Sequence, residues 1–185
     1  MAAQRAMSRR GPLELTLADI AVEAGVTPGL LVQRFGGKRE LLLALSARFS
    51  GGSGEIFAGL RRVHRSPLAA LRAYAGCMAR LAATPEALSR NLAYLQIDLT
   101  DADFRAHLVK HARSTRRHLE ALVSDAMDAG ELKSGARSRH LARVVETAIS
   151  GSLMTWACYQ EGPAARWIRH DLEAVLRPHL RARRR

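Results

Sequence analysis

The stretch that most constrains the fold of this chain is LADIAVEAGVTPGLLVQRFGGKREL, residues 17–41. Apolar residues recur at helical spacing on both sides of the short segment EAGVTP, so the turn between two helices can hold only about three or four residues. Gly25 suits the left-handed position at which a helix ends, and Thr27 followed by Pro28 is a typical helix start. The pattern predicts a compact helix pair, which occurs in DNA-binding helix-turn-helix motifs and in ordinary helical cores alike.

Helical periodicity continues along the rest of the 185 residues. Alanine, leucine and arginine are frequent, aromatic residues make up only 5%, and no segment alternates as a strand does. Gly51, Gly52 and Gly54 leave open either one soft helix to about residue 63 or a break near residue 51. We therefore predict an all-α fold of about nine helices, which cover residues 2–10, 17–24, 28–35, 38–63, 67–83, 86–97, 101–129, 137–160 and 164–181.

The charge and the cysteines narrow the class of protein. Lysine and arginine outnumber aspartate and glutamate by 29 to 17, a formal net charge of +12, which suggests a polyanionic partner or simply an arginine-rich proteome. Cys77 and Cys158 form no CxxC pattern, which excludes a disulfide scaffold and a zinc module and fits a reducing cytoplasm. No stretch approaches about 18 uninterrupted apolar residues, and no signal peptide is evident. We expect a soluble, cytoplasmic protein with no membrane partner.

A set of residues around the helix pair recurs in a known family: Ala2-Ala3, Gly11, Thr16, Ile20-Ala21, Ala24-Gly25-Val26, Phe35, Lys38 and Leu41. On these residues the segment from Ala2 to Leu45 resembles the N-terminal DNA-binding domain of the TetR family of transcriptional regulators. Two features depart from the family pattern: Val32 stands where a tyrosine is usual, and the first helix begins almost at Met1, without the usual apolar residues upstream.

The resemblance implies a three-helix DNA-binding domain over residues 1–47 and a helical ligand-binding and dimerisation domain over residues 48–185. In such a domain the second helix of the motif enters the major groove of double-stranded operator DNA by its N-terminal end. Thr16 and Lys38 would contact phosphate, and Arg34 would pair with guanine or with phosphate. The other residues expected to contact DNA are Thr27, Pro28, Gly29, Leu30 and Gln33.

The C-terminal region carries no sharp motif, so its site is also inferred from the resemblance. In such regulators the C-terminal helices enclose a cavity for a small-molecule effector, although each aromatic or soft residue there is core by default. Apolar stripes over residues 137–181 would pair with the same helices of a second subunit, or else would only close the core of the monomer. The residues expected to line the cavity are Tyr74, Met78, Phe104, His107, His111, Trp156 and Tyr159.

A stripe of histidines raises the question of other chemistry. His107, His111 and His118 share one edge of the predicted helix 101–129, and a histidine pair at i, i+4 can hold a metal. No cysteine or carboxylate completes such a site and no nucleophile–base pair is evident, so we predict no metal, no cofactor and no enzymatic activity. We expect a homodimeric repressor that a small molecule releases from a palindromic operator. The alternatives are a ligand-binding or scaffold dimer with weakened DNA binding, which Val32 favours, and a small enzyme that uses the histidines.

Overall fold

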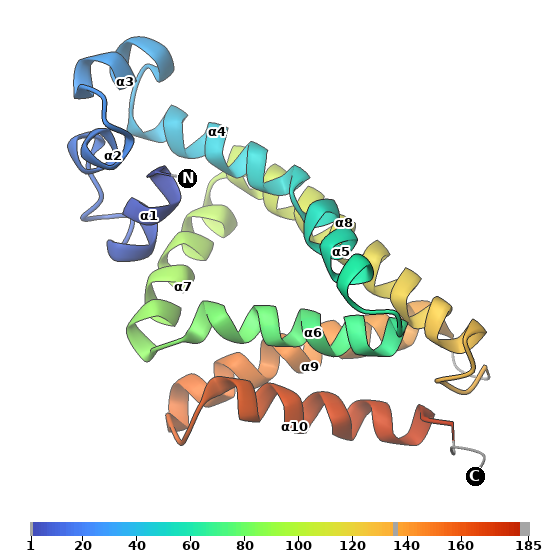
Figure 1. The fold of residues 1–185 in the computed structure, drawn as a ribbon. Coiled ribbons are helices and arrows are strands. Elements are labelled where there is room, and N and C mark those ends of the chain that lie inside the picture. Colours follow the sequence, from blue (N-terminus) through green and yellow to red (C-terminus); the bar gives the residue numbers. More distant parts are fainter. Residues whose placement is uncertain (1, 135–136, 182–185) are drawn as a thin grey trace. The chain divides into compact units, whose positions relative to one another are not determined.

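The computed structural model describes residues 2–134 and 137–181, which form ten α-helices, two 3-10 turns and no strand (Figure 1). The all-α prediction is therefore confirmed. By its packing the chain divides into two compact units: Met1–Gly52 with Glu86–His111 in the first, and Ser53–Pro85 with Ala112–Arg185 in the second. The first unit contains the whole predicted DNA-binding domain and adds a helix pair from later in the chain. The boundary after residue 47 concerns function and stays a prediction.

Local capping defines the helices of the first unit. At the start of α2, the Thr16 hydroxyl accepts a hydrogen bond from the Asp19 amide at 3.1 Å, and the Asp19 carboxylate accepts one from the Thr16 amide at 2.9 Å. Gly25 ends α2 in the left-handed conformation, with φ of 67°. The Thr27 hydroxyl then caps α3, whose first residue is proline. The helices of this unit are α1 (Ala2–Arg9), α2 (Leu17–Ala24), α3 (Pro28–Phe35), α4 (Lys38–Gly51), most of α7 (Pro85–Thr100) and the start of α8 (Ala102–Asp128).

One apolar cluster holds the first unit together. Phe104, in the first turn of α8, is buried in this cluster, and Tyr94 and Ile97 of α7 pack against it. The core under the helix-turn-helix is thus completed by residues that follow it by more than fifty positions. The remaining buried members are Ala6, Leu15, Ile20, Ala21, Leu31, Leu41 and Leu42.

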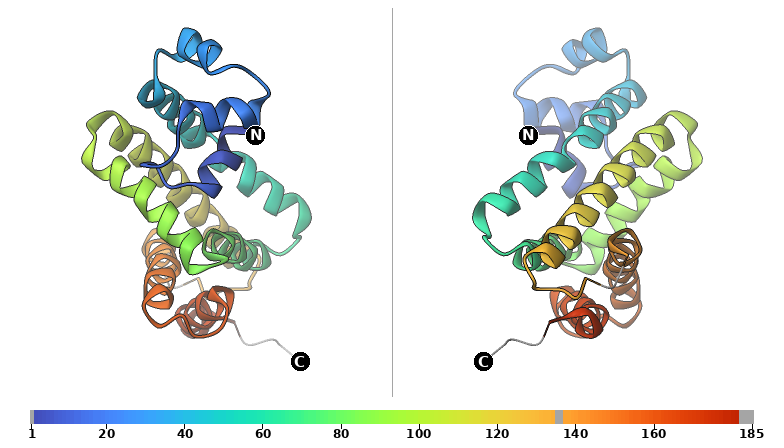
Figure 2. Two further views of the ribbon diagram at one scale, coloured as in Figure 1. Left: turned by 90° about the vertical axis from the view of Figure 1, so that its left-hand side faces the viewer. Right: turned by 90° about the vertical axis from the view of Figure 1, so that its right-hand side faces the viewer.

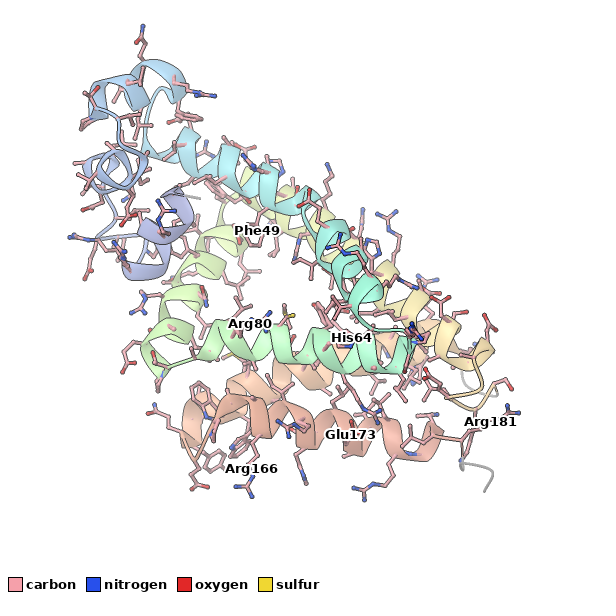
Figure 3. All side chains as sticks on the ribbon, viewed as in Figure 1. Phe49, His64, Arg80, Arg166, Glu173 and Arg181 are labelled. Atoms are coloured by element: carbon pink, nitrogen blue, oxygen red, sulfur yellow. The ribbon has the colours of Figure 1, made fainter. Side chains whose placement is uncertain are left out.

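In the second unit α6, α9 and α10 lie alongside one another (Figure 1), and α9 and α10 are seen nearly end-on in Figure 2. Arg72 of α6 forms a two-pronged ion pair with Glu173 of α10, with N–O distances of 2.5 and 2.8 Å. Glu173 is labelled on α10 in Figure 3. The α-helices of this unit are α5 (Ser53–Val63), α6 (Pro67–Ala79), the rest of α8, α9 (Ser138–Tyr159) and α10 (Ala164–Leu176), with 3-10 turns at Arg80–Ala82 and Arg177–His179.

Helix ends differ from the sequence prediction where proline or glycine intervenes. The break left open near residue 51 is present, because Gly52 separates α4 from α5. The predicted helix 164–181 was too long: α10 ends at Leu176, and Pro178, which has no amide hydrogen to donate, lies in a 3-10 turn. Among the described residues no helix is both long enough and apolar enough to cross a membrane.

The apolar stripes expected over residues 137–181 face the inside of the second unit. Their members are buried in one cluster together with residues of α5, α6 and α8. The stripes therefore close the core of a single chain and do not by themselves indicate a dimer. A second subunit would have to bind another face of these helices. The buried residues of α9 and α10 in this cluster are Leu141, Ala142, Val145, Ile149, Ile168, Leu172 and Leu176.

Candidate nucleic-acid interface

The surface of α3 consists of the residues predicted to read DNA. Leu31 is buried and Phe35 is half-buried, and these two side chains fix the helix on the core. Leu30 and Val32 are about half exposed, at 47% and 46%. The other exposed predicted contacts are Thr27, Pro28, Gly29, Gln33 and Arg34. The arrangement presents one whole face of a short helix to solvent.

Arg34 is the cation of this face. Its guanidinium lies 5.5 Å from the ring centroid of Phe35, and it forms no ion pair with another described residue. No acidic residue lies on α3. A planar guanidinium is suited to guanine or to phosphate, and the DNA contact of Arg34 stays a prediction.

The acidic side chains of α2 are paired with arginines of α1 and with the residue that follows α1. Glu23 receives hydrogen bonds from Arg5, at 3.0 Å, and from Arg9, while Arg10 lies 3.5 Å from the Asp19 carboxylate. These pairs offset the negative charges of α2, so they reduce repulsion of phosphate beside the helix-turn-helix. Sequence reasoning missed them, although the i, i+4 spacing of Arg5 and Arg9 was a usable signal.

Thr16 and Lys38, the predicted phosphate contacts, are both engaged within the protein. The Thr16 hydroxyl donates to the Asp19 carboxylate at 2.6 Å, which uses its only hydrogen, and this bond is the first cause of the lowered pKa of Asp19. The Lys38 ammonium donates to the Pro12 carbonyl oxygen at 2.7 Å. An ammonium has three donors, so Lys38 keeps two for phosphate, whereas Thr16 has no spare side-chain donor. Both DNA roles stay predictions.

The seven residues predicted to line an effector cavity are divided between the two units. Phe104, His107 and His111 belong to the first unit, where Phe104 is buried in the core. In the second unit Tyr74 of α6 stacks on Phe57 at 4.8 Å, and burial raises its pKa to about 12. Met78, on the same helix, packs partly buried against the core.

The last two predicted effector residues, Trp156 and Tyr159, lie at the C-terminal end of α9. The Trp156 indole is buried and donates to the Gly162 carbonyl oxygen at 2.9 Å, while Tyr159 is 63% exposed and stacks on Trp167 at 5.7 Å. A surface groove of about 720 Å³ runs along α10, where Arg166 is labelled in Figure 3, but none of the seven residues lines it. Their role in ligand binding stays a prediction.

His111 has an unusual environment. Its Nδ1 atom is buried and has no hydrogen-bond partner among the described residues, and its ring lies 6.1 Å from that of Phe49 on α4. Phe49 is labelled in Figure 3. Burial lowers the pKa of His111, while a hydrogen bond with the Phe49 backbone raises it, as donation to a carbonyl does. The ring is therefore neutral near pH 7 with Nδ1 as an unsatisfied acceptor. Among the described residues no group of three His, Cys, Asp or Glu side chains is placed to hold a metal ion.

The exposed, carboxylate-free α3, seated behind a tight turn on a small helical core, defines a helix-turn-helix DNA-binding protein. Residues 1–45 match the model of the family described as bacterial regulatory proteins, tetR family. The HTH-type transcriptional regulator BetI of Agrobacterium fabrum is 31% identical over 149 residues, which cover 73% of this chain and 68% of that protein. The chain belongs to the TetR family of transcriptional regulators.

Other relatives match over shorter lengths or by fold alone. The regulator BetI of Brucella anthropi is 54% identical over 43 residues, but the match spans only 23% of this chain and 22% of that protein. A TetR regulator from Haloarcula marismortui shares the fold with a TM-score of 0.71 at 20% identity, over 97% of this chain and 95% of that one. SmeT, described as the repressor of the Stenotrophomonas maltophilia multidrug efflux pump SmeDEF, gives 0.68 at 22% identity, over 98% and 88%.

Proposed function

We propose that the protein is a homodimeric repressor that binds a palindromic operator through α3 and is released by a small molecule. The observation that carries this proposal is the exposed face of α3, where Arg34 forms no ion pair with another described residue and the acidic residues of α2 are paired with Arg5, Arg9 and Arg10. SmeT, which has the same fold, is described as a repressor and has also been solved as a complex with triclosan. We propose repression and release by a ligand for this chain because of its similarity to SmeT.

The proposed mechanism is allosteric. In a dimer, two copies of α3 reach adjacent major grooves only if they lie about 34–36 Å apart. A ligand that binds more tightly to a dimer with another spacing shifts the population away from the DNA-binding form. Such a ligand needs no contact with α3. His111, with its buried acceptor, and His107, one turn earlier on α8, are the polar groups that we assign to ligand recognition.

The test is a binding titration on DNA that flanks the gene for this protein. We expect one palindromic duplex to bind at least about a thousandfold more tightly than a scrambled duplex of the same composition, at physiological salt. Equal affinity for the two duplexes would instead favour the ligand-binding or scaffold dimer with weakened DNA binding. A strong salt dependence with no preference would identify non-specific binding by the +12 charge alone.

Replacement of Lys38 by alanine tests whether this residue contacts phosphate or reads the base sequence. We expect Lys38→Ala to weaken binding to the operator and to the scrambled duplex by similar factors, and to reduce the salt slope by about one per subunit. Arg62→Ala, an exposed arginine on α5, is the matched control and should leave the slope unchanged. A change in sequence preference with an intact slope would show that Lys38 reads bases.

Val32 is the position at which this chain departs from its family. Its side chain is 46% exposed on α3, so a tyrosine would have room to extend toward the DNA backbone. A phenol hydroxyl bound to phosphate adds about 1.5–3 kcal/mol at best. We therefore expect Val32→Tyr to raise operator affinity by about tenfold, the lower end of that range, without altering thermal stability. Equal affinities at physiological salt would mean that position 32 does not face phosphate.

The dimer is proposed on the outer face of α9. Thr147, Gly151, Met154 and Cys158 recur at i, i+4, i+7 and i+11, and all four are exposed. Small side chains at this spacing allow two helices to approach closely, and Met154, 47% exposed, is soft enough to adapt to a partner. This face, rather than the stripes buried inside the monomer, is the surface that we assign to the second subunit.

A further inference from the structure

An arginine near the start of α4 is bound to the start of α8. Arg39 donates from Nη2 to Asp101 at 2.7 Å and to Asp103 at 2.9 Å, and from Nε to Asp101 at 3.2 Å. Its guanidinium also lies 5.7 Å from the ring centroid of Phe104. All four residues belong to the first unit, although the arginine and the aspartates are more than sixty positions apart in sequence.

Asp101 performs two tasks at once. It directly precedes α8, and its Oδ1 atom accepts a hydrogen bond from the Asp103 amide at 2.9 Å, so it caps the helix. Its other oxygen, Oδ2, binds Arg39. The hydrogen bond with Arg39 is also the first cause of the lowered pKa of Asp101. Asp101 accepts two of the three hydrogen bonds from Arg39 and is 30% exposed. Asp103 is 63% exposed and accepts one, which is the first cause of the raised pKa of Arg39.

The neighbours of this ion pair are fixed as well. Phe104, the next residue on α8, is buried in the apolar core of the first unit. Lys38, which directly precedes Arg39, donates to the Pro12 carbonyl oxygen in the loop between α1 and α2. Two consecutive residues of α4 thus bind two different elements: Lys38 binds the loop before the helix-turn-helix, and Arg39 binds the cap of α8.

We propose that Arg39 is a positioning residue for operator binding, which fixes the start of α4, and with it Lys38, to the cap of α8. The proposal rests on the proposed operator binding. Through Arg39, a displacement of the first turn of α8 would also displace the start of α4, where Lys38 is expected to bind phosphate. In the competing role Arg39, half exposed and beside Lys38, contacts phosphate directly. The two roles predict opposite effects of Asp101→Asn on operator affinity.

The test is a double-mutant cycle of Arg39→Ala and Asp101→Asn, read as operator affinity and salt slope. Asparagine is as good a helix cap as aspartate, so Asp101→Asn removes the ion pair and keeps the cap. We expect each single variant to bind the operator about tenfold more weakly with an unchanged salt slope, and the double variant to be no weaker than the worse single one. Asp128→Asn, which removes an exposed carboxylate at the other end of α8, is the matched control and should change affinity less than threefold.

The direction of the Asp101→Asn effect is decisive. Loss of a carboxylate from a DNA-binding surface strengthens binding to phosphate when only charge matters. Tighter binding by Asp101→Asn, additive effects, or a slope reduced by about one per subunit in Arg39→Ala would each overturn the proposal and make Arg39 a phosphate contact.

A measurement on the free protein tests the role of Arg39 independently of the proposed operator binding. Amide hydrogen exchange of the free protein reports whether the ends of the two helices are held. We expect the Leu41 and Asp103 amides to exchange at least about tenfold faster in Arg39→Ala, with the core of the second unit unchanged. If the wild-type protein does not distinguish operator from scrambled DNA while Arg39→Ala shows this faster exchange, the proposed operator binding is refuted and the link between α4 and α8 through Arg39 stands. Unchanged exchange in Arg39→Ala would refute the link between α4 and α8 through Arg39.

Discussion

Gly151→Arg is expected to convert the protein into a monomer and to weaken operator binding by at least about a hundredfold. A Cβ atom at Gly151 would meet nothing within 4 Å in the monomer, so the substitution leaves the chain's own packing intact. Between two closely packed copies of α9 the same side chain would add bulk and like charge, which such a contact does not tolerate. A monomer contacts only one half-site, and it loses the affinity that two linked half-sites provide.

The measurement is light scattering at micromolar concentration followed by an operator titration. Wild-type protein should have twice the chain mass of 20.3 kDa, and the variant should have that mass once. Gly59→Arg is the matched control, because Gly59 is also helical, on α5, and also has open space at its Cβ position. A variant that stays dimeric would move the interface away from the outer face of α9, and a monomeric wild-type protein would remove the dimer from the mechanism.

His111→Phe is expected to stabilise the free protein while it removes the proposed ligand contact. A buried polar atom without a partner costs about 1–3 kcal/mol, and an aromatic ring of similar shape removes that cost. The variant also loses the hydrogen bond with the Phe49 backbone, but the Phe49 carbonyl oxygen still accepts one from the Gly52 amide at 3.0 Å. For a chain of this length such a gain raises Tm by roughly 2–12 °C. Stability gained by removing a polar group from a binding site is the usual trade-off between stability and function.

The lowered pKa of His111 also predicts how the stability of the protein changes with pH. Burial lowers the pKa of His111 in the folded protein, so between the unfolded value, about 6.5, and the lower folded value the unfolded chain binds more protons. Stability of the wild-type protein should therefore fall as pH is lowered from 7 through this window, and His111→Phe should flatten that decline. His118, whose pKa is lowered first by burial, contributes in the same direction and remains in the variant. An equal or lower Tm for the variant at pH 7 would show that Nδ1 is satisfied.

Local signals were sufficient to predict the two helices of residues 17–35. The capping box of Thr16 and Asp19, the left-handed Gly25 and the Thr27-Pro28 start each act over three or four residues, so the sequence contains them whole. The bounds of α2 and α3 agree with the prediction to the residue. The exposed residues of α3 were expected from the family resemblance, and the burial of Leu31 was not predicted.

Partners of the helix faces could not be predicted in the same way. An apolar stripe on α9 or α10 shows that a face is buried but not whether its own chain or a second chain covers it. Phe104 was expected at an effector cavity and lies in the core beneath the helix-turn-helix, because α8 begins there. The pair of Arg39 and Asp101 joins residues 62 positions apart and carries no periodic signal at all. These features depend on tertiary packing, which a single sequence does not contain.

The most direct test of the account is the spacing of the two half-sites. If a dimer presents two copies of α3 to adjacent major grooves, five base pairs inserted at the centre of the operator move one half-site to the opposite side of the duplex. We predict that the lengthened operator binds no better than scrambled DNA, and that ten inserted base pairs restore part of the affinity. Equal affinity for the original operator and the duplex lengthened by five base pairs would contradict binding by a two-fold symmetric pair of recognition helices.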